Sequence, residues 1–143
     1  RHAHRYGSKV GVLFVDLDRF KEINDHHGHH VGDAVLTEVA KRLTSSVRDS
    51  DSVARLGGDE FVVLLEQVEG RGDCLAAAHK IEQALNADRG FYGIDVQITA
   101  SIGQALYPED GADEDALIRA ADAAMYRVKS GCESERQRCL ALQ

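Results

Sequence analysis

The sequence predicts a single α+β domain, an α/β sandwich in which helices flank a central sheet of mostly antiparallel strands. Apolar runs of strand length alternate along the chain with segments whose apolar residues recur every three or four positions. Two consecutive glycines join two of the strand-like runs, which is typical of a hairpin between antiparallel strands. The 143 residues are enough for one domain with a sizeable core.

The predicted order begins with a strand and a short helix. Residues 10–15 are apolar at nearly every position, as in a central strand that is covered on both faces. Asp18 is placed to cap a short helix that carries Phe20 and Ile23 on one side. The histidine-rich run at 26–30 is expected to be a solvated loop rather than a zinc site, because no cysteine lies near it.

A longer helix and a hairpin follow. The helix is predicted over 33–47, where apolar residues recur four positions apart. Strands are predicted over 52–55 and 60–66, with Gly57 and Gly58 between them. Because glycine accepts a positive φ without steric cost, this pair favours a tight turn.

The second half of the chain adds a helix, a strand and a final helix. The apolar spacing predicts a helix over 75–85, and the alternation over 94–106 predicts one long, half-buried strand. The last helix is expected to begin near Asp113 and to end at Lys129 and Gly131, since a cation and a glycine commonly close a helix.

The composition narrows the classes of partner. The 17 basic and 24 acidic residues give a net charge of −7, which disfavours nucleic acid or an anionic membrane as a partner. The longest strongly apolar run is too short to span a bilayer. The three cysteines form no Cys-x-x-Cys pair, which favours reduced thiols and a cytoplasmic location. Because the chain does not begin with Met, it is expected to be part of a longer protein. That longer protein could be anchored in a membrane by another segment.

Acidic residues stand at the end of the first strand and at the tip of the hairpin. Asp16 follows the apolar run, and Asp59 and Glu60 follow the two glycines. Two acids in a tight turn repel each other unless a positive charge lies nearby. If the hairpin lies beside the first strand, Asp16, Asp59 and the Leu17 carbonyl form a set of hard oxygen ligands that suits Mg²⁺. Spacing alone also allows a polar hairpin tip with solvated acids, so both interpretations stay open.

Several ordered motifs fall together into one pattern. Residues 55–61 read Arg-Leu-Gly-Gly-Asp-Glu-Phe. The further segments that belong to the pattern are 14–25, 28–29, 31–33, 101–103, 106–111 and 121–126. In order and spacing, the set resembles the GGDEF domain of the diguanylate cyclase family. The resemblance covers residues 10–131 and is highly specific, because many motifs match at once.

The resemblance implies a fold similar to the palm of adenylyl cyclases and polymerases. It also implies an enzyme, a nucleotidyltransferase that makes the bacterial second messenger cyclic di-GMP from two GTP and releases two pyrophosphates. Each domain of the family holds one GTP, and two domains meet face to face as a homodimer. The 3′-hydroxyl of each GTP then attacks the α-phosphate of the other with the help of Mg²⁺ or Mn²⁺.

The resemblance also gives roles to residues at the matching positions. The metal ligands implied are Asp16, the Leu17 carbonyl and Asp59. The catalytic residues implied are Asp59, Glu60 and Lys21, and Asp59 helps to activate the 3′-hydroxyl. A metal-bound hydroxyl loses its proton more easily, so these roles agree with the chemistry of a carboxylate cluster.

The remaining positions of the pattern are implied to bind GTP. They are Phe20, Lys21, Asn24, Asp33, Gly57, Gly58 and Lys129. Asn24 and Asp33 correspond to the positions that read guanine. A carboxylate can accept hydrogen bonds from both N1–H and the 2-amino group of guanine, and adenine lacks that pair of donors.

Arg48 and Asp51 resemble a second motif of the family, an Arg-x-x-Asp inhibitory site shortly before the signature. The resemblance implies feedback inhibition, in which Arg48 binds the phosphate and guanine of cyclic di-GMP and Asp51 accepts from guanine. The alternative is a surface ion pair worth under about 1 kcal/mol. The position of the pair next to the signature favours the inhibitory site.

The chain departs from the pattern at both ends. Residues 1–131 are expected to form a GGDEF domain that lacks the opening block of the family, and 132–143 a tail or the start of a linker. The family ends its last helix with Lys-x-x-Gly-Arg-Asn, whereas Lys129 is followed here by Ser-Gly-Cys-Glu. A phosphate-binding arginine is therefore missing from its position or is supplied by Arg136.

Two functions follow from the resemblance. The first is a diguanylate cyclase that serves as a signalling domain beside sensor or EAL phosphodiesterase domains. The alternative is a catalytically weak domain that binds GTP or cyclic di-GMP and regulates an attached EAL domain. A purely structural dimerisation module is a third interpretation, but it leaves the acids, the glycines and the guanine-reading positions unexplained. No contact with nucleic acid or membrane is expected of this domain.

Overall fold

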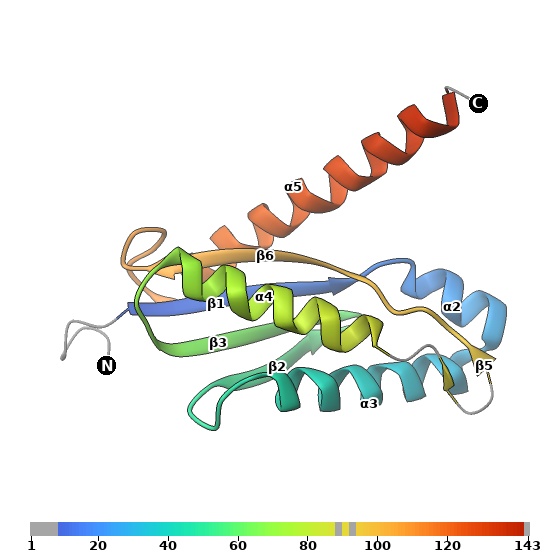
Figure 1. Ribbon diagram of the computed structural model, residues 1–143, viewed down its shortest axis with the longest axis horizontal. Helices are drawn as coiled ribbons and strands as arrows, with labels where there is room; N and C mark the ends of the chain where they lie inside the picture. The colour runs from blue at the N-terminus through green and yellow to red at the C-terminus, as the bar shows by residue number, and fades with distance from the viewer. Residues whose placement is uncertain (1–8, 88–89, 92–93, 142–143) are drawn as a thin grey trace.

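The computed structural model describes the backbone of residues 9–87, 90–91 and 94–141, and the side chains of residues 9–87 and 96–131. Its centre is a four-stranded sheet in the order β2-β3-β1-β6, in which each neighbouring pair is antiparallel (Figure 1). The strands are β1 (Lys9–Leu17), β2 (Ser52–Gly57), β3 (Glu60–Val68) and β6 (Ala100–Tyr107). The predicted α+β fold is confirmed.

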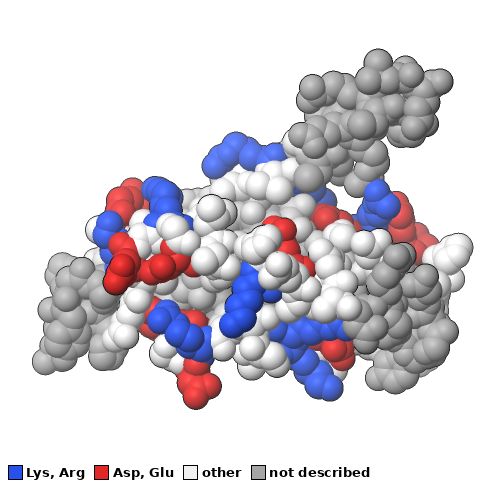
Figure 2. Space-filling model, viewed as in Figure 1, with Lys and Arg blue, Asp and Glu red and all other residues white. Residues whose placement is uncertain are grey.

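Helices cover both faces of the sheet. They are α2 (Phe20–His27), α3 (His29–Ser46), α4 (Arg71–Asn86) and α5 (Glu114–Ala141). α3 and α4 pack on one face and α5 packs on the other (Figure 1). A two-stranded sheet of β4 (Gly90–Phe91) and β5 (Ile94–Asp95) follows α4. Acidic and basic side chains are interspersed over the face that carries α3 and α4 (Figure 2).

The central strand β1 separates two apolar clusters. Leu13 and Val15 are fully buried in the cluster that includes α3 and α4, whereas Val12 and Phe14 belong to the cluster that includes α5. Side chains alternate between the faces of a strand, so this division explains the unbroken apolar run in the sequence. The same alternation places Asp16, at the end of the run, on the face that carries α5.

α5 lies directly against β6 at Gly103. A Cβ atom at this position would collide with the backbone nitrogen of Met125 and the backbone oxygen of Ala121. Glycine is therefore required by the close approach of helix and strand. Because Lys129 follows Met125 by about one helical turn, this contact also determines where the Lys129 side chain meets the sheet.

The histidine-rich run is helical, so the predicted loop at 26–30 is wrong. The two residues before Gly28 complete α2, and the two after it begin α3. Gly28 has a φ of 90°, which glycine adopts without strain, and one such residue is enough to turn the chain from one helix into the next.

The predicted capping role of Asp18 is also wrong. The residue at the start of α2 is Arg19, with a φ of 57° and no side-chain cap. The Asp18 carboxylate instead accepts hydrogen bonds from Thr99 Oγ1 at 3.0 Å and Ser101 Oγ at 2.8 Å. The Asp18 carboxylate is thus bound by two hydroxyl groups on the neighbouring segment and not by the backbone amides in the first turn of α2.

The strand predicted over 94–106 is divided in two. β5 ends at Asp95 and β6 begins at Ala100, although Val96 and Ile98 between them are buried. Alternate burial in an extended segment gives the same apolar pattern as a paired strand. The pattern could therefore predict which side chains are buried but not where the hydrogen bonding stops.

The end predicted for the last helix is wrong as well. α5 runs through Lys129 and Gly131 and continues to Ala141. A glycine inside a helix costs only about 1 kcal/mol relative to alanine, and no proline follows to stop the helix. The side chain of Arg136, the proposed substitute for the missing arginine, lies outside the described residues.

Candidate active site

The acidic residues singled out in the sequence meet at the end of β1. Asp16 lies opposite Glu60 of β3 on one side and opposite Ser101 of β6 on the other. The Leu17 amide donates a hydrogen bond to the Asp59 carbonyl at 3.1 Å. The hairpin thus lies beside the first strand, which is the arrangement that the predicted metal site requires.

Asp16 is a buried carboxylate that is only partly neutralised. Its Oδ2 accepts a hydrogen bond from Lys129 Nζ at 3.2 Å, and its Oδ1 has no hydrogen-bond partner among the described residues. Burial, followed by the negative charge of Asp59, raises the pKa of Asp16 to about 6, although Lys129 acts in the opposite direction. The negative charge at the end of β1 is therefore larger than the single positive charge of Lys129 can neutralise.

These groups fit a divalent cation of the Mg²⁺ type. A buried carboxylate oxygen without a partner is costly and calls for a ligand. Asp16 and Asp59 supply the hard oxygen atoms that Mg²⁺ prefers. The described residues include no group of three or more His, Cys, Asp or Glu side chains that could hold a metal by themselves. Backbone oxygen, water and substrate phosphate are the usual remaining ligands of this ion.

Lys129 reaches this site from α5. Burial by itself would lower the pKa of Lys129, but the hydrogen bond to Asp16 and the charges of Asp16, Asp18 and Asp59 together raise it. The family resemblance places Lys129 near the phosphates of GTP, whereas in this structure the side chain binds Asp16. Sequence reasoning missed this contact.

Thr99 and Ser101 are two further polar residues that sequence reasoning missed. Both donate to Asp18, and the Asp18 amide donates to the Thr99 carbonyl at 2.9 Å. Ser101 is almost fully buried, at 3% exposure. In the sequence, Ser101 alternates with Gly103 and Ala105 along the predicted strand, and a hydroxyl at a position expected to face the core is the signal that could have identified it. These bonds hold the segment after β1 against β6.

The residues that the resemblance assigns to guanine lie where α2 meets α3. A Cβ atom at Gly32 would collide with Asn24 Oδ1 and would lie 3.4 Å from the Phe20 ring. Asn24 is half-buried, whereas Lys21 and Asp33 are exposed. The structure therefore brings Asn24 of α2 beside the α3 turn that carries Asp33. Gly32, which sequence reasoning did not single out, makes this close approach possible.

The hairpin tip is open around its glycines. Gly57 and Gly58 have φ values of 151° and 51°, and no atom lies within 4 Å of a Cβ built at either position. Arg55 Nε donates to the Gly58 carbonyl at 3.0 Å, an anchor of the turn that sequence reasoning missed. Asp59 and Glu60 themselves are half-buried. The tip is therefore not a fully solvated acidic turn, which was the alternative interpretation.

Arg48 and Asp51 lie at the opposite end of the hairpin strands. The Asp51 side chain is 2% exposed and accepts from the Arg48 amide at 3.0 Å and from the Glu66 amide at 2.9 Å. Arg48 is 59% exposed and donates to the Glu66 carbonyl at 2.6 Å. Both residues line a cavity of about 280 Å³ that Lys80 also borders. The pair is thus built into the fold and is separate from the acidic site.

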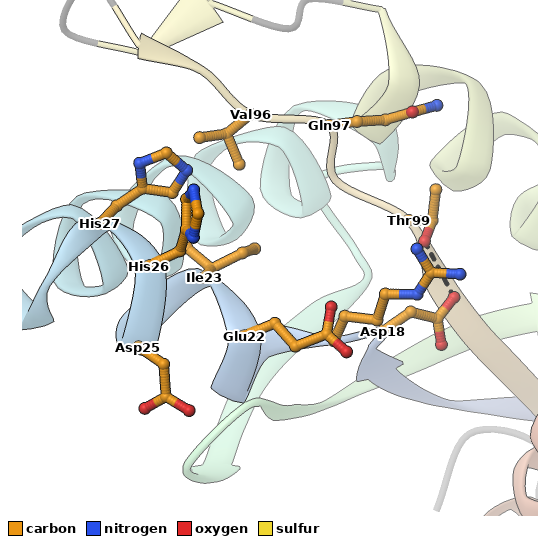
Figure 3. A pocket seen from close by; sticks show the side chains of 10 residues that line it. Asp18, Glu22, Ile23, Asp25, His26, His27, Val96, Gln97 and Thr99 are labelled. Carbon is orange, nitrogen blue, oxygen red and sulfur yellow. Dashed lines mark hydrogen bonds between the residues drawn. The ribbon is translucent and has the colours of Figure 1, made fainter.

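A larger pocket of about 810 Å³ lies between α2 and the segment that leads into β6. Figure 3 shows His26, His27, Glu22 and Asp18 at this pocket, with Asp18 hydrogen-bonded to Thr99. The His26 and His27 rings pack edge to face, with their centroids 5.0 Å apart. Neither Asn24 nor Asp33 lines this pocket, so it is distinct from the place where α2 meets α3.

Comparison with known proteins defines the family. The sequence model of the family "Diguanylate cyclase, GGDEF domain" matches residues 1–135. The chain belongs to this family. It is 46% identical over 129 residues to the bifunctional diguanylate cyclase/cyclic di-GMP phosphodiesterase MucR of Pseudomonas aeruginosa, an alignment that covers 90% of this chain and 19% of MucR. The chain thus spans about a fifth of that relative.

Solved structures agree with this assignment. The crystal structure of the GGDEF domain of TpbB (YfiN) from Pseudomonas aeruginosa has a TM-score of 0.87 at 45% identity, and the match covers 92% of this chain and 82% of that one. The GGDEF domain of DgcB from Caulobacter crescentus, solved in complex with cyclic di-GMP, has a TM-score of 0.80 at 27% identity, covering 91% and 77%. Within the described part of the chain, no helix is long and apolar enough to cross a membrane.

Proposed function

We propose that this domain is a diguanylate cyclase, which condenses two GTP into cyclic di-GMP and releases two pyrophosphates. The observation that carries the proposal is the closeness of the Asp16 and Asp59 carboxylates. Asp59 raises the pKa of Asp16, and the buried Oδ1 of Asp16 has no hydrogen-bond partner among the described residues. Membership of the GGDEF family supports it, as does the name of MucR, a bifunctional cyclase and phosphodiesterase.

In this proposal, Asp16, the Leu17 carbonyl and Asp59 hold Mg²⁺ or Mn²⁺. When bound, the ion lowers the pKa of the 3′-hydroxyl and stabilises the charge that builds on the α-phosphate. Asp59 orients the attacking hydroxyl. Glu60 lies opposite Asp16 on the adjacent strand β3 and adds a further acid beside the site. Lys21, on the exposed side of α2, neutralises charge on the terminal phosphates.

The nucleotide lies against the hairpin tip and α2. The Asp33 carboxylate accepts from N1–H and the 2-amino group of guanine, and the Asn24 amide both donates and accepts, so that guanine is distinguished from adenine. The Phe20 backbone binds the terminal phosphates, and Lys129 adds a phosphate contact from α5. Gly57 and Gly58 leave space for the nucleotide because they lack side chains.

The reaction needs two domains because each one binds a single GTP. In the homodimer, the oxygen of each 3′-hydroxyl forms a bond to the α-phosphorus of the other GTP, and the bond from that phosphorus to pyrophosphate breaks. Each hydroxyl proton passes to the acidic site at Asp59 or to water. Two such attacks close the ring of cyclic di-GMP.

Feedback inhibition at Arg48 completes the proposal. The Arg48 guanidinium is exposed at the mouth of a cavity and can bind phosphate and guanine with its fork of donors. Both Asp51 oxygens already accept backbone hydrogen bonds, so Asp51 also holds the loop in shape. The complex of the DgcB GGDEF domain with cyclic di-GMP supports product binding in the family.

The wider setting follows from the length of the relatives. The chain covers 19% of MucR, whose name includes a phosphodiesterase activity. We propose that this domain works beside sensor or EAL domains in a longer protein, on the cytoplasmic side, where GTP is available.

Incubation of the purified domain with GTP and Mg²⁺ tests the proposed activity. Cyclic di-GMP should form at a rate that rises more than linearly with protein concentration, because two domains must meet. The matched control is Asp59→Asn, which should bind GTP but form cyclic di-GMP about 10²–10³-fold more slowly. If the unmodified domain binds GTP and cyclic di-GMP yet yields no product at any concentration, the domain is the regulatory module of the alternative interpretation.

A further inference from the structure

Lys129 connects the last helix to the acidic site through one ion pair. Its Nζ lies 3.2 Å from Asp16 Oδ2, between residues 113 positions apart in the sequence. The pair is largely enclosed, with 13% of the Asp16 side chain and 32% of the Lys129 side chain exposed. The contact of α5 with Gly103 of β6 fixes the helix that carries Lys129.

We infer that Lys129 occupies the place of a divalent cation on Asp16 when no cation is bound, and that an entering cation displaces it. The inference rests on the proposed function, since it concerns the metal site at Asp16 and Asp59. It assigns Lys129 a role in metal binding in addition to the phosphate contact.

A comparison with the neighbouring Asp18 explains why Asp16 needs a positive charge from the protein when no metal ion is bound. Asp18 is satisfied by the hydroxyls of Thr99 and Ser101. Asp16 receives no such bonds: Lys129 binds Oδ2, and Oδ1 is unpartnered within the described residues. A buried carboxylate without a counter-charge is strongly destabilising. An ammonium at the end of a flexible stem supplies that charge and can also withdraw from it.

A divalent cation on Asp16 competes with Lys129. Mg²⁺ binds carboxylate oxygens at about 2.0–2.1 Å, so both cations would lie within a few ångströms of each other on the same carboxylate. Their repulsion is twice that of two single charges at the same separation. Release of Lys129 then makes its ammonium available to the phosphates. Metal binding and phosphate binding are thereby coupled through one side chain.

Lys129→Gln tests the competition, with Mn²⁺ alone as the probe and without nucleotide. The variant should bind Mn²⁺ about fivefold more tightly, as measured from the electron paramagnetic resonance signal of unbound Mn²⁺. The same substitution should weaken binding of a fluorescent GTP analogue in the presence of Mg²⁺. Arg127→Gln is the matched control because it removes one charge from an exposed position of the same helix. It should change neither affinity by more than about twofold.

The outcomes separate this inference from the proposed function. If the unmodified domain does not bind Mn²⁺, or if Asp16→Asn leaves binding unchanged, the proposed metal site is wrong. If binding depends on Asp16 but Lys129→Gln binds Mn²⁺ equally or more weakly, the inference about Lys129 is overturned and the metal site stands. Should Lys129→Gln fail to fold, the ammonium resonance of Lys129 in the unmodified domain provides a second measurement. It should shift on saturation with Mg²⁺, and an unmoved resonance would also overturn the inference.

Discussion

Asp59 affects the site through charge more than through packing. It is half-buried at the open tip of the hairpin, and its carboxylate contributes to the raised pKa of Asp16. Neither apolar cluster includes it. A substitution that keeps the shape and removes the charge therefore separates chemistry from folding.

Asp59→Asn should lower the rate of cyclic di-GMP formation by about 10²–10³-fold, the scale of losing a group that stabilises charge in a transition state. The free energy of unfolding should fall by no more than about 0.5 kcal/mol, since the change is away from the core. Product assays and urea unfolding of the same preparation measure both. A variant that loses activity because it unfolds would contradict the assigned role.

The raised pKa of Asp16 gives the metal-free domain a pH-dependent stability. Its value of about 6 in the folded protein lies above the ordinary 3.8, so the native state binds the proton more tightly than the unfolded chain does. This contribution is fully present below pH 4 and is lost as the pH rises through 6. It amounts to at most about 3 kcal/mol.

Urea unfolding in a chelator between pH 4 and pH 7 measures this effect. The free energy of unfolding should include a component that decreases with rising pH, and Asp16→Asn should remove that component. Equal slopes in the two proteins would show that Asp16 does not titrate in this range.

Part of the site could be predicted from local patterns. The two glycines predict a tight turn with acids at its tip, because a hairpin is encoded by neighbouring residues. That Asp59 then meets Asp16 depends on the pairing of β3 with β1, which could only be assumed from the sequence. The contact between Lys129 and Asp16 spans 113 positions and depends on how α5 crosses the sheet. The Ser101 hydroxyl reaches Asp18 only because β6 pairs with β1 in one particular register. Such contacts follow from the assembled fold and not from spacing.

For the helices and strands, too, some features could be predicted from local sequence and others could not. Apolar spacing located each helix of the main fold and each strand of the four-stranded sheet, because burial of one face is encoded locally. Their ends depended on single residues whose effect the pattern does not reveal. Gly28 separates two helices without a loop, and Gly131 does not end α5.

Gly103→Ala should destabilise the domain by about 2–3 kcal/mol, because the added methyl group meets the α5 backbone, which cannot move as a side chain can. Gly131→Ala is the matched comparison within α5, where a Cβ meets nothing within 4 Å. It should stabilise the domain by about 0.5–1 kcal/mol as the helix gains a better former. Thermal unfolding compares the two, and a change of the same sign in both would contradict the described path of α5.

Across the whole molecule, the β2–β3 hairpin connects two separate sites. Its tip carries Asp59 and Glu60, and the other end is bound to Asp51 and Arg48 through Glu66. Between them, β3 pairs with β1 on one side and with β2 on the other, so the hairpin is a stiff connection. A ligand at Arg48 therefore binds a residue that is hydrogen-bonded to the hairpin that carries the acids.

Arg48→Ala should relieve inhibition by cyclic di-GMP and leave the initial rate within about twofold, since Arg48 is remote from the acidic site. The cost in stability should stay near 1 kcal/mol, because an exposed side chain loses its hydrogen bond to the Glu66 carbonyl and its 3.4 Å ion pair with Asp51, which keeps two backbone hydrogen bonds. Progress curves with and without added product measure the change. Unaltered inhibition in the variant would refute the inhibitory role.

The position of β1 in the middle of the sheet has a consequence for motion. Its amides have partners in β3 and β6 on both sides, so their exchange with solvent deuterium requires the domain to open as a whole. The hairpin tip is less enclosed, because a Cβ at Gly57 or Gly58 would meet no atom within 4 Å, although Arg55 Nε holds the Gly58 carbonyl. We expect the amides of the tip to exchange by local opening, faster than those of β1. Asp16 then stands on the more rigid strand and sets the position of the site, while Asp59 stands on the turn that adjusts to what enters it.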